Sequence, residues 1–144
     1  MLKTLLLLPL FGAALISLLP SRRVDLLRYL ASIVAALTML CAFLMLLDFD
    51  TASSAIQFFE TRPWNPRVGS SLALGVDGIS MAMLLLATVL CFVAILSSTA
   101  VRNGAKLHFS LILVLETSLL VVFAARDWSL FYVFWELTLI PLFF

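Results

Sequence analysis

Five apolar segments, separated by shorter polar stretches, run along the chain from one end to the other. Each segment has 17 to 20 residues, close to the length that an α-helix needs to cross about 30 Å of hydrocarbon. A helix is also the open-chain structure that pairs all of its backbone groups within one segment in lipid. The pattern therefore predicts membrane-spanning helices over residues 2–19, 28–47, 79–98, 107–125 and 128–144.

Residues 48–78 form a longer polar segment that interrupts this pattern. Within it, Leu72, Leu74 and Val76 alternate on one side of the chain, a weak signal for a strand. Asp77 and Asp127 precede the third and fifth apolar segments, where each can cap a helix N-terminus. Because no linker or low-complexity tract occurs, residues 1–144 are expected to form one membrane unit.

The composition makes a membrane protein the expected class. The chain is 64% hydrophobic and 12% charged, with a mean hydropathy of +1.19, whereas soluble domains are about 45–50% apolar and about 25% charged. A soluble domain of this size could not bury so much apolar surface. The expected fold class is therefore all-α and integral to the membrane. The net charge of +1 excludes a basic patch for nucleic acid.

The first apolar segment also resembles a secretory signal peptide, with one Lys, an apolar stretch and small residues at 12–14. A retained helix is favoured because the run is long and Arg22 and Arg23 follow it instead of preceding it.

Charges in the loops predict the orientation of the chain. The short loops near residues 20–27 and 99–106 carry an excess of basic residues, whereas the long segment 48–78 is richer in acids than in bases. Since Lys and Arg favour the cytoplasmic side, the N-terminus and the long segment are expected outside, and the two short loops inside. The charges concerned are Arg22, Arg23, Arg28, Arg102 and Lys106 in the short loops, and Asp48, Asp50, Glu60, Asp77, Arg62 and Arg67 in the long segment.

The cysteines indicate no metal centre. Cys41 and Cys91 each lie inside an apolar segment, without a CxxC motif or a His at ligand spacing, so zinc and iron–sulfur ligation are unsupported. Small apolar packing residues are the expected role. No glycine-rich nucleotide-binding motif occurs either.

Two carboxylates within apolar segments are the main candidates for chemistry. Glu136 lies nine residues after Asp127, and Glu116 lies eight residues after His108, which places both about 12–13 Å along their helices and near the middle of the bilayer. The short turn at 125–127 makes the two helices antiparallel neighbours. A charged side chain in lipid costs about 2.5–3.5 kcal/mol on insertion scales, so each carboxyl is expected to face protein or water.

Such carboxyls suit proton transfer, because burial disfavours the ionised form and leaves a group that can bind and release a proton near neutral pH. Tyr132 and Ser129 lie on the same helix face as Glu136 and extend it into a polar stripe. Pro141 frees the carbonyl of Leu137 and loosens the helix beyond the stripe.

A structural alternative exists for each of these residues. Either Glu can hydrogen-bond a neighbouring helix and fix packing. His108, beside Lys106, is either a proton relay or a solvated interface residue. Arg126 and Asp127 are either a functional pair or anchors of helix ends. Tyr132, with the tryptophans at 128 and 135, suits a membrane belt as well as a relay.

Two motif blocks add a family resemblance. GVDGIS (75–80), preceded by PWNPRVG (63–69), and ETSLLVVFAARDWSLFYVFWELTLIP (116–141) resemble the antiporter-like subunit M of bacterial NADH:quinone oxidoreductase, respiratory complex I, called chain 4 in organelles. The likeness covers essentially the whole chain. It is similar, less closely, to cation/proton antiporter and membrane-hydrogenase subunits.

The resemblance implies a proton-translocating subunit of the membrane arm, in a bacterial or organellar inner membrane. Its implied partners are other membrane-arm subunits, lipid and protons, and it binds no cofactor itself. NADH, FMN, iron–sulfur clusters and quinone are bound by other subunits. Glu136 matches the family's glutamate that pairs with a later lysine and is essential to pumping. Glu116 matches a position that is acidic in many but not all close relatives.

The chain also departs from the family, whose members carry about fourteen helices in two inverted repeats. It holds five apolar segments and no Lys after Lys106. The expectation is an N-terminal, truncated part of the subunit that is inactive alone. Two other hypotheses remain open, a non-catalytic membrane scaffold or assembly protein and a sodium/proton antiporter subunit.

Overall fold

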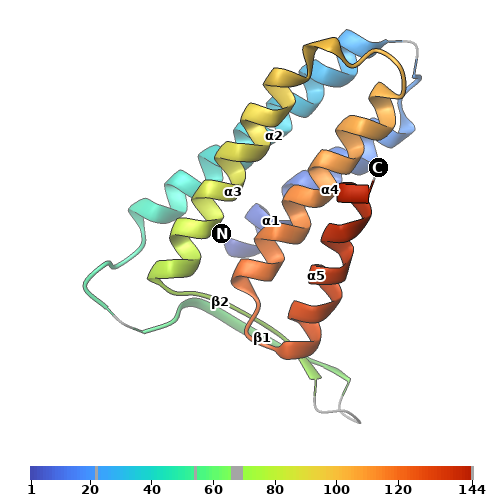
Figure 1. Ribbon diagram of the computed structural model, residues 1–144. Coiled ribbons are helices and arrows are strands. Elements are labelled where there is room, and N and C mark those ends of the chain that lie inside the picture. The colour runs from blue at the N-terminus through green and yellow to red at the C-terminus, as the bar shows by residue number, and fades with distance from the viewer. Residues whose placement is uncertain (22, 54, 66–69, 144) are drawn as a thin grey trace.

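The computed structural model describes residues 1–21, 23–53, 55–65 and 70–143. These residues form five α-helices, α1 (Leu2–Leu18), α2 (Val24–Leu47), α3 (Gly78–Ser97), α4 (Ala105–Ala124) and α5 (Trp128–Phe143), with a short 3-10 turn, η1 (Ser98–Ala100) (Figure 1). The five predicted helices are confirmed, each end within four residues of its predicted position. Arg22, Arg67 and Phe144 lie outside the described residues, as do residue 54 and the rest of 66–69.

The segment between α2 and α3 makes the all-α expectation incomplete. It contains an antiparallel pair of strands, β1 (Gln57–Asn65) and β2 (Ser70–Val76). The weak strand signal over 71–76 is confirmed, whereas β1 was not predicted. Two irregularities in its pairing and a positive φ of 52° at Phe58 disrupt the two-residue alternation that would have indicated a strand.

The helices fit a multi-pass membrane protein. α2, α3 with η1, and α4 are long and apolar enough to span a bilayer, and α1 and α5 are shorter apolar helices of 17 and 16 residues. Large apolar side chains such as Phe11, Leu47 and Leu90 are exposed around the bundle. In lipid these side chains need no protein cover, so their exposure costs nothing there.

α4 is the central helix of the bundle. It packs against α1, α2, α3 and α5, whereas α5 rests mainly on α4 and β2. Figure 1 shows α4 and α5 side by side and antiparallel, joined by the turn that lies over the strands. The inner face of α4 is fully buried and repeats at helical spacing through Phe109, Leu113, Glu116, Leu120 and Ala124.

The core of the bundle consists of two apolar clusters with polar side chains between them. One cluster lies at the end covered by the strands, here called the hairpin end, and the other lies toward the opposite end. At their boundary, buried polar residues come from three helices. This mid-bundle polar layer consists of Thr38 of α2, Thr88 of α3, and Glu116, Thr117 and Ser118 of α4.

Helix geometry places the members of this layer at one depth. Thr38 lies ten residues before Asp48, Thr88 eleven after Asp77, and Glu116 ten before Arg126. Each position is about 15 Å from the hairpin end at 1.5 Å per residue. The layer therefore lies near the middle of a bilayer.

The strands close the hairpin end against the helices. Lys3 at the start of α1 forms an ion pair with Glu60 of β1, and Leu74 of β2 forms a bridge with Ala125 after α4. Leu72 and Leu74 line a groove of about 220 Å³ beside α1, α4 and α5, and Val76 is fully buried. The side of β2 predicted to be apolar is thus the side that meets the bundle.

We predict that Gly12→Ala destabilises the bundle by about 1–2 kcal/mol. A Cβ at Gly12 would lie 2.5 Å from Val34 Cγ1 of α2, and the β-branched valine has few other rotamers in a helix. Thermal unfolding in lipid nanodiscs measures the change. Gly78→Ala is the matched control, because a Cβ there meets nothing within 4 Å. Equal losses in both variants would show that the α1–α2 approach does not depend on Gly12.

Candidate functional site: the carboxyls of α4 and α5

Glu116 lies in the mid-bundle polar layer and is completely buried. Within the described part of the chain, neither of its carboxylate oxygens has a hydrogen-bond partner. An unpaired charge in such a place is costly, so the neutral, protonated carboxyl suits this position.

The hydroxyls of the layer provide acceptors and no free protons. Each donates to a carbonyl of its own helix, at distances of 2.8–3.0 Å: Thr38 to Val34, Thr88 to Leu85, Thr117 to Leu113 and Ser118 to Val114. An ionised Glu116 therefore finds no donor among them, whereas a protonated one could donate to a hydroxyl oxygen. The packing role considered for Glu116 requires an interhelical hydrogen bond, and the described residues supply none.

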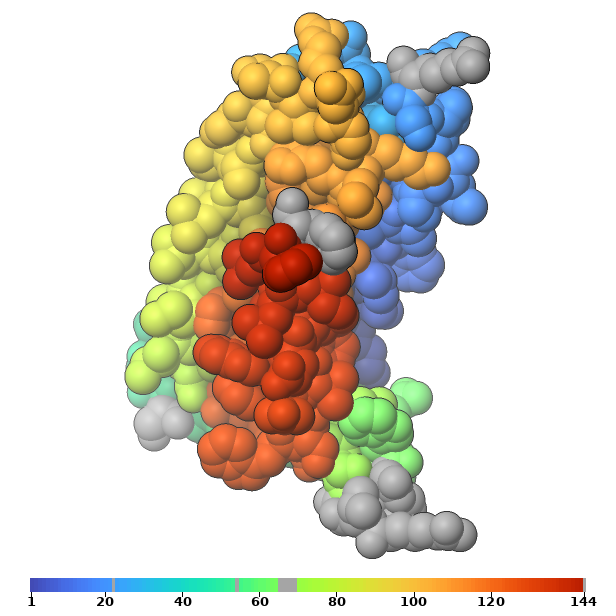
Figure 2. Space-filling model, turned by 45° about the vertical axis from the view of Figure 1, so that its right-hand side comes forward, coloured from blue at the N-terminus to red at the C-terminus, as the bar shows by residue number. Residues whose placement is uncertain are grey.

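Glu136 lies on the outer side of α5, away from the bundle core. Its side chain is exposed and lines a shallow groove with Val133, Leu137 and Ile140. Figure 2 shows α5, in red, forming a front face of the molecule with no other helix over it. This carboxyl was predicted to face protein or water, and among the described residues no protein segment covers it.

The polar stripe predicted on α5 is present. Tyr132 lies one turn before Glu136 on the same side of α5, and Ser129 is exposed one turn before Tyr132. Tyr132 is 62% exposed. The stripe thus runs along the outer side of α5 from its first turn to Glu136.

The two carboxyls lie at the same depth but point to different sides. Glu116 and Glu136 are ten residues before and after Arg126, which places each about 15 Å from the turn that joins their helices. Glu116 points into the bundle and Glu136 points outward. Their similar depth on adjoining helices agrees with the prediction, and their opposite directions could not be predicted from spacing alone.

His108 lies toward the end of the bundle opposite the strands, apart from both carboxyls. Its Nε2 is 3.0 Å from the Ser98 hydroxyl, and its ring meets Phe109 edge-on at 5.3 Å between centroids. The fully buried Phe109 and Leu113 lie between its level and that of Glu116. The described residues thus provide no polar chain that joins His108 to Glu116, so its role as a relay stays a prediction.

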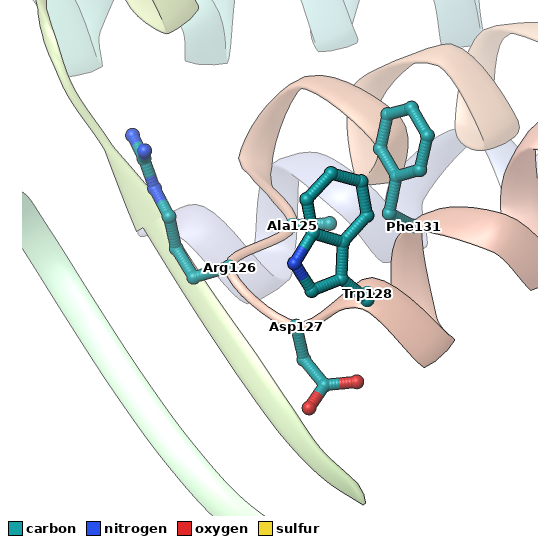
Figure 3. Close-up of a pocket in the computed structure, with 5 residues that line it drawn as sticks. All are labelled: Ala125, Arg126, Asp127, Trp128 and Phe131. Carbon is teal, nitrogen blue, oxygen red and sulfur yellow. The ribbon is translucent and has the colours of Figure 1, made fainter.

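Arg126 and Asp127 directly precede α5 and do not pair with each other. Figure 3 shows their side chains pointing apart on either side of the turn. Arg126 Nη2 is 2.9 Å from Asp77 Oδ2, and its Nε donates to the Gly75 carbonyl at 3.3 Å. The backbone N–H of Arg126 donates to Ala73 of β2 at 2.8 Å.

Asp77 and Asp127 are both helix caps, as predicted. Asp77 accepts from the Ser80 N–H at 2.8 Å, and Asp127 accepts from the Ser129 and Leu130 N–H groups at 2.9 and 3.2 Å. The other oxygen of Asp127 accepts from the Ser71 N–H of β2 at 3.2 Å. We call Asp77, Arg126 and Asp127 the hairpin clasp, because together they tie β2 to the starts of α3 and α5.

Hydrogen bonds and charge lower the pKa values of both clasp carboxyls. The pKa of Asp77 falls from 3.8 to about 2, first through the hydrogen bond from the Ser80 N–H and then through Arg126. The hydrogen bond from the Ser71 N–H is the largest cause of the lowered pKa of Asp127. Both carboxyls are therefore ionised near neutral pH.

Aromatic rings follow the clasp along α5. Trp128 meets Phe131 edge-on at 6.1 Å, and Phe131 stacks on Trp135 at 5.8 Å. Trp128 is 87% exposed at the hairpin end, the position of an aromatic at a membrane–water interface. Cys41 and Cys91 are free thiols within helices, and the described residues contain no group of three or more His, Cys, Asp or Glu that could hold a metal ion.

Comparison with known proteins identifies relatives of this helical arrangement, although no family model matches the chain. The chain is 36% identical over 143 residues to NAD(P)H-quinone oxidoreductase chain 4-3 of Nostoc sp., covering 99% of this chain and 26% of that protein. It is 39% identical over 99 residues to F(420)H(2) dehydrogenase subunit M of Methanosarcina mazei, covering 68% of this chain and 20% of that protein.

A solved structure agrees with these relatives. Respiratory complex I from Thermus thermophilus with bound NADH contains a chain that matches 98% of this one with a TM-score of 0.81 and 32% identity. The chain belongs to the complex I chain 4, or subunit M, family. It spans about a quarter of the length of the family members it matches.

Within this chain 4 segment, the partner of Arg126 and the buried threonines of α2 and α3 at the depth of Glu116 were not predicted. Asp77 and Arg126 are 49 residues apart, and their pairing depends on β2, which precedes Asp77 directly, lying beside the turn that holds Arg126. The layer had a signal that could have been used, since Thr38 and Thr88 interrupt apolar helices at the same distance from the hairpin end as Glu116.

We predict that acid destabilises this chain 4 segment partly through Asp77. Because the folded-state pKa of Asp77 is lowered to about 2, its contribution to stability is complete above its ordinary pKa and is lost as the pH falls from about 4 to about 2. Asp77→Asn keeps an oxygen that can cap Ser80 and removes the charge, so unfolding temperatures between pH 2 and 6 should vary less than in the parent chain. An unchanged pH dependence would contradict the ion pair.

Proposed function

We propose that this chain forms part of the proton-translocating path in the membrane arm of a complex I-type quinone oxidoreductase. The observation that carries the proposal is the pair of carboxyls at one depth, Glu116 and Glu136, on the adjoining antiparallel helices α4 and α5. Membership of the chain 4 family supports it, since relatives are named as chains of quinone oxidoreductases.

Glu136 is the principal proton-carrying group in this proposal. An ionisable side chain that faced lipid would cost about 2.5–3.5 kcal/mol, and this chain leaves Glu136 exposed on the outer side of α5. The assembled complex therefore covers this face with protein. The resemblance implies a lysine partner for Glu136, which the covering protein would supply.

Glu116 is an auxiliary site in the same path. Its burial and its lack of a donor partner favour the protonated form, so it would give up a proton only when a positive charge or water approached. Tyr132 would assist Glu136 from one turn earlier on the same side of α5. A relay role of His108 would be at the end of α4 that lies away from the strands.

Electron transfer belongs to other subunits in this proposal. The relatives are named for different electron donors, F(420)H(2) in one case and NAD(P)H in another, yet they share this segment at similar identity. Such a shared segment supports a role that does not depend on the donor. NADH, FMN, iron–sulfur clusters and quinone would bind elsewhere in the complex, and the partners of this chain would be other membrane-arm subunits.

The charges at the two ends support an orientation. Arg23, Arg28, Arg102 and Lys106 lie toward the end opposite the strands, whereas Asp48, Asp50, Glu60 and Asp77 lie at or near the hairpin end. By the positive-inside rule, we place the N-terminus and the hairpin outside and the two short loops in the cytoplasm or matrix. The host would be a bacterial or organellar inner membrane.

We predict that Glu136→Gln lowers proton translocation by the intact complex at least tenfold, a loss of the size expected when a proton-transfer group is removed. Glutamine keeps the shape of the side chain and cannot titrate. Proton uptake into proteoliposomes during quinone reduction measures the effect. Glu60→Gln is the control, since it removes a carboxyl from β1 without touching α5. Normal pumping by Glu136→Gln would refute the proposed function.

We predict that Glu116→Gln lowers the pumping rate less, by about two- to fivefold, and leaves the complex assembled. The amide is as neutral as the protonated carboxyl that the polar layer favours, so burial costs change little. Amounts of assembled complex are compared on native gels and pumping in proteoliposomes. Loss of assembly with Glu116→Gln would indicate a structural role for the carboxyl instead.

A further inference from the structure

The start of α5 is fixed far more firmly than the rest of the helix. Of the sixteen residues of α5, Leu130 and Thr138 are buried, and the helix rests mainly on α4 and β2. By contrast, the hydrogen bonds of the hairpin clasp tie the turn before α5 to β2 and α3, which lie 46 to 56 positions earlier in the sequence. The position of α5 therefore depends strongly on what holds its first turn.

Arg126 makes the contacts that reach furthest from this turn. Its guanidinium bonds to the Gly75 carbonyl on β2, to the Asp77 carboxylate before α3, and to the Ser80 hydroxyl at 3.4 Å. Its side chain is 24% exposed, so solvent screens this pairing less than it screens a surface ion pair. One side chain thus joins the start of α5 to β2 and α3.

The stem of Arg126 lies beside β2 at Gly75. A Cβ at Gly75 would lie 3.5 Å from Arg126 Cγ, an ordinary van der Waals distance, and only 2.5 Å from Ile56 Cγ2. The absence of a side chain at Gly75 is therefore required by Ile56. The strand and the arginine are close neighbours as well as hydrogen-bonded.

Geometry links this anchor to the proton path. Glu136 lies nine residues beyond Asp127, about 13 Å along a rigid helix, so a tilt of about 10° at the first turn would move it by about 2 Å. Proton transfer needs donor and acceptor at hydrogen-bond distance, about 2.6–3.2 Å. A displacement of 2 Å would break such contacts.

We propose that Arg126 and Asp77 are positioning residues for Glu136: by fixing the first turn of α5 to β2 and α3, they set the depth and tilt of this carboxyl in the membrane. The inference rests on the proposed role of Glu136 in proton translocation. Neither residue carries a proton in this scheme, and the pair acts through the helix that it holds.

Three variants in the intact complex test the proposal. Arg126→Gln removes the charge and most of the contacts. Asp77→Asn removes the ion pair while keeping an oxygen that can cap Ser80. Arg126→Lys keeps the charge but loses the fork that reaches Gly75, Asp77 and Ser80 together. Glu60→Gln is the matched control, because it breaks the other ion pair at the hairpin end, Lys3–Glu60, which does not touch α5.

Two readouts are compared for each variant, both normalised to the amount of assembled complex. One is the rate of proton translocation into proteoliposomes. The other is the membrane depth of a nitroxide attached through Ile140→Cys, measured by its relative accessibility to oxygen and to a water-soluble nickel reagent. Ile140 is exposed, lines the same groove as Glu136 and lies one turn beyond it, so a tilt at the first turn moves the label at least as far as that carboxyl.

Arg126→Gln and Asp77→Asn should each lower translocation by about three- to tenfold and change the depth of the label. Arg126→Lys should be intermediate, and Glu60→Gln should match the parent in both readouts. Unchanged depth in both Arg126→Gln and Asp77→Asn would overturn the proposal, whether or not pumping fell. If Glu136→Gln pumped normally, the proposed function would fail, and the label would still show whether the clasp positions α5.

Discussion

An acid group in the hydrocarbon of a membrane has to be neutral, paired or shielded from lipid, and the chain meets this constraint in two ways. Glu116 lies at the boundary of two apolar clusters, fully buried, among hydroxyls whose protons are already donated to their own helices. That environment accepts a proton-bearing carboxyl and penalises an ionised one. Glu136 lies on the outer side of α5, where only another protein surface could shield it.

One carboxyl is thus held inside the bundle, and the other lies on its outer side. The helices α1 to α4 form a core that holds Glu116 in place, and α5 presents Glu136 to whatever adjoins the chain. The hairpin end connects the two, because β2 contacts α3, α4 and α5. The clasp residues beside this strand thus lie where the core of the bundle meets the helix that carries the exposed carboxyl.

The positions of the helices and of both carboxyls could be predicted from sequence, because lipid permits few backbone structures and makes apolar segments easy to recognise. The caps Asp77 and Asp127 were predictable for a similar reason, since both precede an apolar segment directly. The direction in which each carboxyl points was not, because α4 is apolar on nearly all sides, and the polar stripe of α5 suits a position facing the bundle as well as one facing a neighbouring protein. The Arg126–Asp77 pair and strand β1 depend on contacts between distant segments, which local patterns do not encode.

In the proposed path the carboxyl of Glu136 changes its protonation state while the complex pumps, and infrared difference spectroscopy of the intact complex tests this change most directly. The carbonyl stretch of a protonated carboxyl, assigned by its absence from a complex with glutamine at position 136, should gain and lose intensity as the pH is varied across the working range. A band of constant intensity over that range, in a complex that pumps, would contradict the account.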